Sequence, residues 1–321
     1  MGAFEYFTIP PLQIEEININ HSNILIKFNE NLNLESLNLY KTHNNKHIAP
    51  DITLVGETID RVNTSFVWDE STTTMTLILT GEVFKPNNYT LTLASREDGL
   101  LTIDGGLLDD RGNAGGDYSY EFTIEETGDT ILSMPDLTLA PGANKNIPVT
   151  LDNVEGANKV EFDLYYDRNF LDITAVNRNS NLPTSWQLTE SEIDSDNGII
   201  NITIEGTDAL TGNNLNLVDL EAVVPDTATY GATQVLDLEN VVLNDGNISA
   251  MDDDAVHQIM QAGDVTGDNK VDNLDAYQMM RVSVGLDDGF VSFPTIDPAI
   301  FADLNQDGII SAFDAYYAVN N

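Results

Sequence analysis

The sequence predicts a mainly β protein, in which two consecutive β-sandwich domains are followed by a small α-helical domain. Two observations predict the sandwiches: apolar residues recur at every second position from Ile14 to about residue 126, and the same alternation returns after Ile147. The third observation is that apolar residues after residue 252 take the spacing of short helices. A chain of 321 residues has room for two or three domains. We therefore expect domains at 1–127, 128–251 and 252–321.

The first sandwich is predicted from strands with one face in water. Its alternating apolar residues are Ile24, Ile26 and Phe28, then Met75, Leu77 and Leu79, then Tyr89, Leu91 and Leu93, and finally Tyr118, Tyr120, Phe122 and Ile124. Thr, Asn and Glu occupy many of the positions between them, which is typical of a half-exposed sheet. Asp98-Gly99 is one of the turn signals between these runs.

The second sandwich follows a segment rich in Gly and Pro near residues 128–142. Its alternating apolar residues are Ile147, Val149 and Leu151, then Val160, Phe162, Leu164 and Tyr166, and then Ile200, Ile202 and Ile204. Asn197-Gly198 and Asp245-Gly246 are turn signals beside these runs. The pattern predicts that this sandwich ends near Ser249.

The composition excludes several classes of function. There are 53 acidic and 13 basic residues, for a formal charge of -40, and such a surface repels nucleic acid and suits cations. The absence of cysteine excludes disulfides, thiolate catalysis and cysteine-based zinc sites. No run reaches the roughly 20 apolar residues of a membrane span. The start, MGAFEYFTIPP, lacks the pattern of a secretory signal, which indicates either a cytosolic protein or part of a longer secreted chain.

An aspartate-rich run from Asp264 has the spacing of a calcium loop. Calcium takes about six to eight oxygen ligands, and a loop of about twelve residues supplies them from alternate positions. The predicted ligands of the first loop are Asp264, Thr266, Asp268, Asp272 and Asp275, with the carbonyl of Lys270. Asn269 occupies the sharp turn, because Asn tolerates a positive φ. Thr266 is a weaker ligand than Asp, so we expect loop one to bind less tightly than its charge suggests.

The same pattern recurs from Asp303. The predicted ligands of the second loop are Asp303, Asn305, Asp307, Ser311 and Asp314, with the carbonyl of Ile309, and Gly308 lies at the turn. Solvated acidic turns are the alternative interpretation, but two loops with one spacing favour calcium. We therefore predict two calcium ions.

The duplicated loop-and-helix pattern of residues 263–321 resembles a dockerin. The last ligand of each loop is Asp rather than the Glu of an EF-hand, and no helix is predicted before the second loop. The resemblance implies that calcium folds the module and that its helices bind a cohesin domain. It also implies the partner-binding residues, which are Asn273, Leu274, Met280, Arg281, Ala312 and Phe313.

Two weaker resemblances cover the sandwiches. Residues 131–250, with PVTLDNV, FLDI and NVVLNDGNIS, resemble a cohesin, which implies a jelly-roll sandwich with a flat face that binds a dockerin. A bare adhesin-type sandwich is the alternative. The first domain, with FKPNNYTLTL and LLDDRGNAGGDYSYEFTI, resembles bacterial Ig-like modules, which implies a spacer or adhesion role.

The sequence gives little support for an enzyme. His43 and His47 have the spacing of a metal pair on a helix, but their surroundings have the composition of a loop. No nucleophile-elbow, phosphate-loop or zinc-protease motif is present. Two tryptophans, Trp68 and Trp186, are fewer than an aromatic-lined sugar-binding cleft would need, and we expect both to pack within the strands.

We therefore predict a non-catalytic scaffolding protein that assembles extracellular complexes through calcium-dependent cohesin–dockerin pairing. Its expected partners are cohesin or dockerin domains of other proteins or of a second copy, with polysaccharide reached only indirectly. We expect an extracellular or cell-surface location as part of a longer secreted chain. The alternative is a surface adhesin or carbohydrate-binding protein whose calcium loops are only structural.

Overall fold

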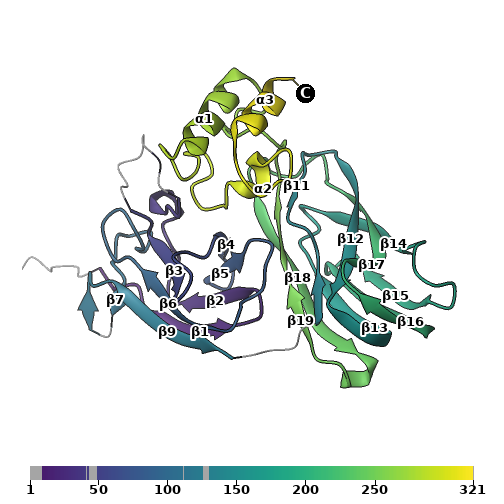
Figure 1. Ribbon diagram of the computed structural model, residues 1–321. Coiled ribbons are helices and arrows are strands. Elements are labelled where there is room, and N and C mark those ends of the chain that lie inside the picture. Colours follow the sequence, from purple (N-terminus) through teal and green to yellow (C-terminus); the bar gives the residue numbers. More distant parts are fainter. Residues whose placement is uncertain (1–8, 41, 43–48, 111, 126–129, 321) are drawn as a thin grey trace, which may run out of the picture.

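The computed structural model describes residues 9–40, 42, 49–110, 112–125 and 130–320. Figure 1 shows two β-rich parts side by side, with the helices of the C-terminal part lying across one end of both. The prediction of a mainly β chain with a small helical C-terminal part is confirmed. No helix in the described part of the chain has the length and apolar character needed to span a bilayer.

The N-terminal domain packs two antiparallel sheets around one core. The first sheet has the order β1-β2-β5-β4, and the second has the order β3-β6-β9. Their strands are β1 (Ile14–Ile19), β2 (Asn23–Phe28), β3 (Ile52–Gly56), β4 (Thr64–Asp69), β5 (Thr74–Leu79), β6 (Asn87–Leu93) and β9 (Tyr118–Ile124), with β7 (Asp109–Asp110), β8 (Asn113–Ala114) and the 3-10 helix η1 (Leu34–Ser36) between them. The predicted apolar residues of β2, β5 and β6 are buried, and those of β9 pack against the same core.

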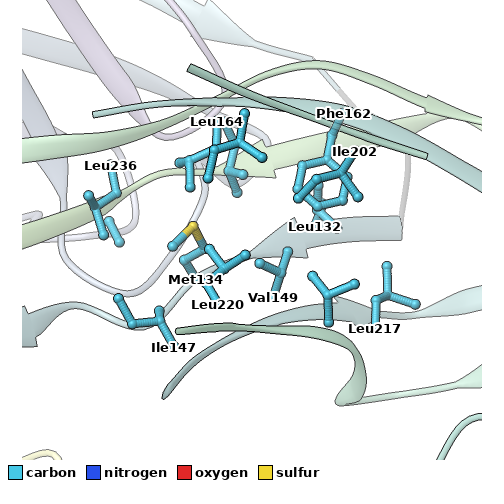
Figure 2. Close-up of a cluster of buried hydrophobic side chains, with 14 of the residues drawn as sticks. Leu132, Met134, Ile147, Val149, Phe162, Leu164, Ile202, Leu217, Leu220 and Leu236 are labelled. Atoms are coloured by element: carbon cyan, nitrogen blue, oxygen red, sulfur yellow. The ribbon is translucent and has the colours of Figure 1, made fainter. Parts of the chain in front are cut away.

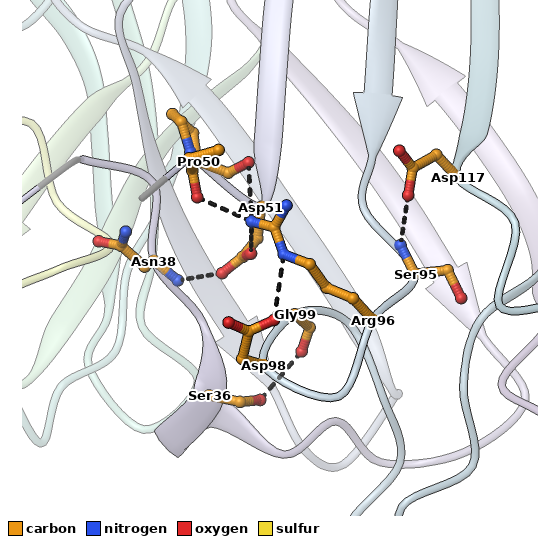
Figure 3. Close-up of polar contacts among 10 residues, drawn as sticks. Ser36, Asn38, Pro50, Asp51, Ser95, Arg96, Asp98, Gly99 and Asp117 are labelled. Carbon is orange, nitrogen blue, oxygen red and sulfur yellow. Dashed lines mark hydrogen bonds and ion pairs between the residues drawn. The ribbon is translucent and has the colours of Figure 1, made fainter. Parts of the chain in front are cut away.

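A partly buried ion pair holds the loops at one end of this domain (Figure 3). The Arg96 guanidinium donates to the carboxylate of Asp51, which is fully buried, and lies 3.3 Å from Asp98. Asp51 also accepts the backbone N–H of Asn38 at 2.7 Å. Two separate loops and the start of β3 are therefore fixed to one another.

The second sandwich has a five-stranded and a six-stranded sheet. The orders are β14-β17-β12-β10-β19 and β11-β20-β18-β13-β16-β15. The strands are β10 (Thr130–Ser133), β11 (Leu137–Thr138), β12 (Asn144–Asp152), β13 (Val154–Tyr165), β14 (Asp172–Arg178), β15 (Gln187–Asp194), β16 (Ile199–Gly212), β17 (Leu215–Val223), β18 (Thr233–Leu243), β19 (Ala250–Asp253) and β20 (Ala255–Gln258), with the 3-10 helix η2 (Asn244–Gly246) after β18. Figure 2 shows inward side chains of both sheets meeting in its core.

The predicted core positions of this sandwich are confirmed. The apolar residues of β12, β13 and β16 on which the prediction rested are all buried. Trp186 is fully buried and donates its indole N–H to the carbonyl of Asp208 at 2.7 Å, whereas the half-buried Trp68 packs against Phe28 and Phe66 in the first domain. Both tryptophans therefore pack within their sandwiches, as expected.

The last two strands extend the second sandwich beyond Ser249, where the sequence pattern predicts its end. β19 pairs with β10 in one sheet, and β20 pairs with β18 in the other, so the chain crosses between the sheets at Asp254. All four residues of β20 are buried. A strand that is buried on both faces shows no alternation of apolar and polar residues, so the alternation in the sequence did not predict β20.

The crossover also joins the sandwich to the N-terminal domain. His21 lies 2.8 Å from Asp252, and Ser22 and Asn23 donate to Asp254 at 3.1 and 2.5 Å. We call these contacts the seam. A cleft of about 440 Å³, lined in part by His21, Asp237 and Asp252, lies beside it.

The helical part has a small core of its own. Its helices are α1 (Asn273–Ser283), α2 (Ala299–Ala302) and α3 (Ala312–Asn320). The expectation of no helix before the second loop is wrong, because the four-residue α2 ends at Ala302, directly before Asp303. The buried Phe301 of α2 packs with Phe290 and Phe293.

Hydrogen bonds on two sides fix the helical part to both sandwiches. Those to the N-terminal domain come from a segment between the two aspartate-rich loops, which we call the wedge segment. In this wedge segment, residues 285–298, the carbonyls of Pro294 and Thr295 accept the backbone N–H groups of Leu39 and Phe66 at 2.8 and 2.9 Å. On the other side, Thr138 donates its hydroxyl to the carbonyl of Ile300 at 2.9 Å. The helical part is therefore fixed to the other two domains and is not a freely tethered module.

Candidate functional site

The two aspartate-rich loops fold with the same backbone turn. Asn269 and Gly308 hold equivalent positions in the two loops, with φ of 65° and 85°. This region of φ is open to Gly and tolerated by Asn, so the turns predicted from the sequence are confirmed. In loop one, Asp264 is fully buried and accepts the backbone N–H groups of Gly267 and Asn269, each at 2.8 Å.

The last aspartate of each loop ties the two ends of that loop together. Asp275 is fully buried and accepts the backbone N–H groups of Thr266 and Asp272 at 2.9 and 2.8 Å. Asp314 is equally buried and accepts those of Leu304 and Ser311, each at 2.8 Å. The two loops therefore place their last predicted ligands in the same way, whereas the first ligand, fully buried at Asp264, is half-buried at Asp303.

The remaining predicted ligands line the outer parts of the loops. Asp268 and Asp307 are exposed, while Thr266, Asn305 and Ser311 are half-buried. Asp272 is exposed and caps the N-terminus of α1 by accepting the backbone N–H of Leu274 at 2.7 Å. The side chains of Lys270 and Ile309 are exposed, so these residues would contribute only their carbonyls.

The donor set fits a hard cation. All side-chain donors are oxygens, which is the chemistry that calcium prefers. Among the described residues, no group of three or more His, Cys, Asp or Glu is placed to hold a metal ion, so the hydroxyl, amide and carbonyl oxygens are needed as well. Asp264, Asp275 and Asp314 are buried, and within the described part of the chain none forms an ion pair with Lys or Arg. Buried carboxylates without a basic partner are an environment that a cation stabilises.

The predicted partner-binding residues lie on the outer faces of α1 and α3. Asn273 and Ala312 are exposed, and Leu274, Met280 and Phe313 expose 61%, 40% and 69% of their surface. Arg281 differs, because its Nε donates to Asp287 at 2.7 Å and its guanidinium lies over the Tyr277 ring.

Two further tyrosines join this surface. Tyr277 and Tyr316 are about as exposed as Leu274 and lie one helical turn after Leu274 and Phe313. That i, i+3 spacing was the available sequence signal. We call Leu274, Tyr277, Met280, Phe313 and Tyr316 the apolar face. The buried positions of the helices are Asp275, Met279, Asp314, Ala315 and Ala318 instead.

One contact to the loops comes from outside the helical part. Tyr230, between β17 and β18, donates its hydroxyl to the carboxylate of Asp264. No local sequence pattern indicates this contact, because the two residues belong to different folding units. His43 and His47, the histidine pair considered for a metal, lie outside the described residues.

Comparison with protein families gives two adjoining matches. Residues 132–262 match the cohesin domain, and residues 262–320 match the dockerin type I domain. Both are non-catalytic protein-interaction modules, and type I dockerin domains bind calcium. The cohesin and dockerin predictions are therefore confirmed, whereas the Ig-like resemblance of the first domain stays a prediction. Among curated proteins the comparison found no match.

Solved cohesin structures resemble part of the chain. A non-cellulosomal cohesin from the archaeon Archaeoglobus fulgidus is 16% identical over 41% of this chain and 92% of its own, with a TM-score of 0.36. The seventh ScaB type I cohesin from Pseudobacteroides cellulosolvens is 17% identical over 40% and 91%, with a TM-score of 0.35. CaCohA2 from Clostridium acetobutylicum is 20% identical over 42% and 92%, with a TM-score of 0.35.

Proposed function

The chain carries a cohesin domain followed by a type I dockerin domain, and on this premise we propose that it assembles extracellular protein complexes by calcium-dependent pairing in trans. The dockerin domain binds a cohesin domain of another molecule, and the cohesin domain receives another dockerin. Two calcium ions are held by the loops that begin at Asp264 and Asp303. The N-terminal domain acts as a spacer, and the chain works at the cell surface or outside the cell.

The observation that carries this proposal is the apolar face. Five large apolar or aromatic side chains are exposed on two short helices of a strongly acidic protein. Exposed apolar clusters rimmed by polar groups are typical of protein-binding surfaces. Aromatic residues at such a surface contribute most of the binding free energy once they are desolvated.

The position of the helical part supports pairing between molecules. It contacts one end of its own cohesin domain, at Thr138 and Tyr230, and the wedge segment holds it there. The outer face of the six-stranded sheet carries acidic residues such as Glu161 and Asp163, and Glu239 of the same sheet lines the cleft beside the N-terminal domain. We take the outer face of this sheet as the dockerin-binding face, so pairing within one chain would require the helical part to leave both sandwiches.

Light scattering over a concentration series tests the proposal. We expect species heavier than 35.2 kDa, or binding to a panel of immobilised cohesin and dockerin domains, in calcium but not in excess chelator.

Leu274→Asp and Phe313→Asp should each weaken dockerin pairing by roughly 2 kcal/mol or more, because each places a charge in a desolvated contact. Ile103→Asp is the matched control, since Ile103 is 65% exposed on the N-terminal domain. Absence of calcium-dependent pairing in both assays would overturn the proposal.

A further inference from the structure

The two calcium loops share one pattern but have different surroundings. Every hydrogen bond that Asp303 accepts in the described part of the chain comes from its own loop, at Asp307 and Gly308. Loop one also accepts hydrogen bonds from residues outside the loop. Ser292 of the wedge segment donates to the carbonyl of Thr266 at 2.6 Å, and Tyr230 of the cohesin domain donates to Asp264.

Tyr230 is held firmly at the boundary between the two domains. Its hydroxyl oxygen accepts the backbone N–H of Gln261 at 3.1 Å, so the hydroxyl hydrogen is directed to Asp264. The next residue, Gly231, donates its N–H to the carbonyl of Ile259 at 2.7 Å. The Tyr230 ring packs against the core of the helical part. Both ends of the side chain are therefore fixed.

The contact falls on the first ligand position of the loop. The Oδ1 atom of Asp264 accepts the N–H groups of Gly267 and Asp268, whereas Oδ2 accepts those of Asn269 and the Tyr230 hydroxyl. Among the described residues, Tyr230 is the one partner of this carboxylate from outside the loop. Groups that hydrogen-bond a metal ligand fix its rotamer and commonly change metal affinity.

We propose that Tyr230 is a positioning residue for the first calcium loop, through which the cohesin domain strengthens calcium binding by the dockerin domain of the same chain. This rests on the calcium loops of the proposed function. The hydroxyl holds the Asp264 carboxylate in the orientation that the loop needs, and it offsets the weaker ligand Thr266. Among the described residues, no side chain from outside loop two donates to Asp303, so the two sites respond differently to the loss of the hydroxyl.

Calcium titration calorimetry on the full chain tests this inference. Asp303→Asn weakens loop two, so the site that remains in that background is loop one. In that background, Tyr230→Phe removes the hydroxyl and keeps the ring, and it should lower the calcium affinity of loop one about tenfold or more. In an Asp264→Asn background, which reports loop two, Tyr230→Phe should change nothing. Tyr317→Phe is the matched control, because it makes the same chemical change at an exposed residue of α3 that lies outside the apolar face.

The outcomes separate this inference from the proposed function. Unchanged affinity of loop one in Tyr230→Phe overturns the inference, and so does a loss seen in Tyr230→Leu but not in Tyr230→Phe, because the ring alone would then matter. A parental chain that takes up no calcium overturns the calcium loops themselves. A parental chain that binds two ions but pairs with no cohesin or dockerin overturns the proposed pairing and leaves the role of Tyr230 to be decided by its own titration.

Discussion

Excess chelator is expected to unfold residues 262–320 while both sandwiches stay folded. The helical part has a small apolar core, and its fully buried carboxylates, Asp264, Asp275 and Asp314, have no basic partner among the described residues. A buried carboxylate without a counter-charge is costly. Counting these buried residues, loop one holds four aspartates and loop two holds three, and their charges repel one another without a cation. In such domains the free energy of metal binding is the free energy of folding.

Hydrogen exchange read by mass spectrometry measures this prediction locally. In chelator, the amides of α1 and α3 should exchange at the rates of unfolded chain, and the helical circular dichroism should be lost. The amides of β12, β13 and β16 should remain protected, because their core is separate from that of the helical part. The wedge segment should lose its protection together with the helices.

Matched variants isolate the role of the loops. Asp264→Asn combined with Asp303→Asn should produce the same exchange pattern in calcium that chelator produces in the parental chain. Asp288→Asn is the control, because Asp288 is exposed in the same domain and lies outside both loops. Helices that stay protected in chelator would contradict the prediction.

The sequence predicted the strands best where one face meets water. Tyr89, Leu91 and Leu93 alternate with Thr90 and Thr92, and that alternation records which face is buried. β20 is buried on both faces, so its residues do not alternate between apolar and polar in a way that would indicate a buried face. Asp253 and Asp254 lie beyond the predicted end of the sandwich, yet both are buried, because the chain crosses between the sheets there.

The backbone turns of the two aspartate-rich loops could be predicted from the sequence because their residue pattern is local. The turn at Asn269 needs only neighbouring residues, and the spacing is visible along the chain. The contact of Tyr230 with Asp264 depends on how two domains pack, and no periodicity encodes it. Helical spacing also could not tell whether Leu274 and Phe313 face a core or solvent. The structure places both in solvent.

Near the seam, four carboxylates have raised pKa values. Burial raises the pKa of Asp253 to about 8, that of Asp136 and Asp237 to about 7, and that of Asp254 to about 6. The neighbouring charges of Asp252, Glu82 and Glu239 add to these shifts. An unfolded chain would release these protons near pH ~4. Between pH ~4 and the folded pKa values, the folded chain therefore binds more protons than the unfolded chain does.

The free energy of unfolding should consequently rise as the pH falls from 8 to 6. Each group that is protonated only in the folded chain contributes about 1.4 kcal/mol per pH unit. His257 acts in the opposite direction, because burial lowers its pKa to about 4, so that below pH ~6.5 the unfolded chain binds this proton and the folded chain does not. One histidine opposes four carboxylates, so we expect a net gain on the order of 2–4 kcal/mol. The thermal midpoint, measured by calorimetry in saturating calcium, should rise by roughly 5–10 °C.

Asp253→Asn should be more stable than the parental chain at pH 8 and should show a shallower dependence on pH. The Oδ1 atom of Asp253 is buried without a hydrogen-bond partner, so its ionised form is the costly one, and the amide removes the charge at similar volume. Asp104→Asn is the control, because Asp104 is exposed on the N-terminal domain. A midpoint that is constant or rises between pH 6 and 8 would contradict burial as the cause. So would an Asp253→Asn variant less stable than the parental chain at pH 8, because the ionised carboxylate would then be stabilising the seam.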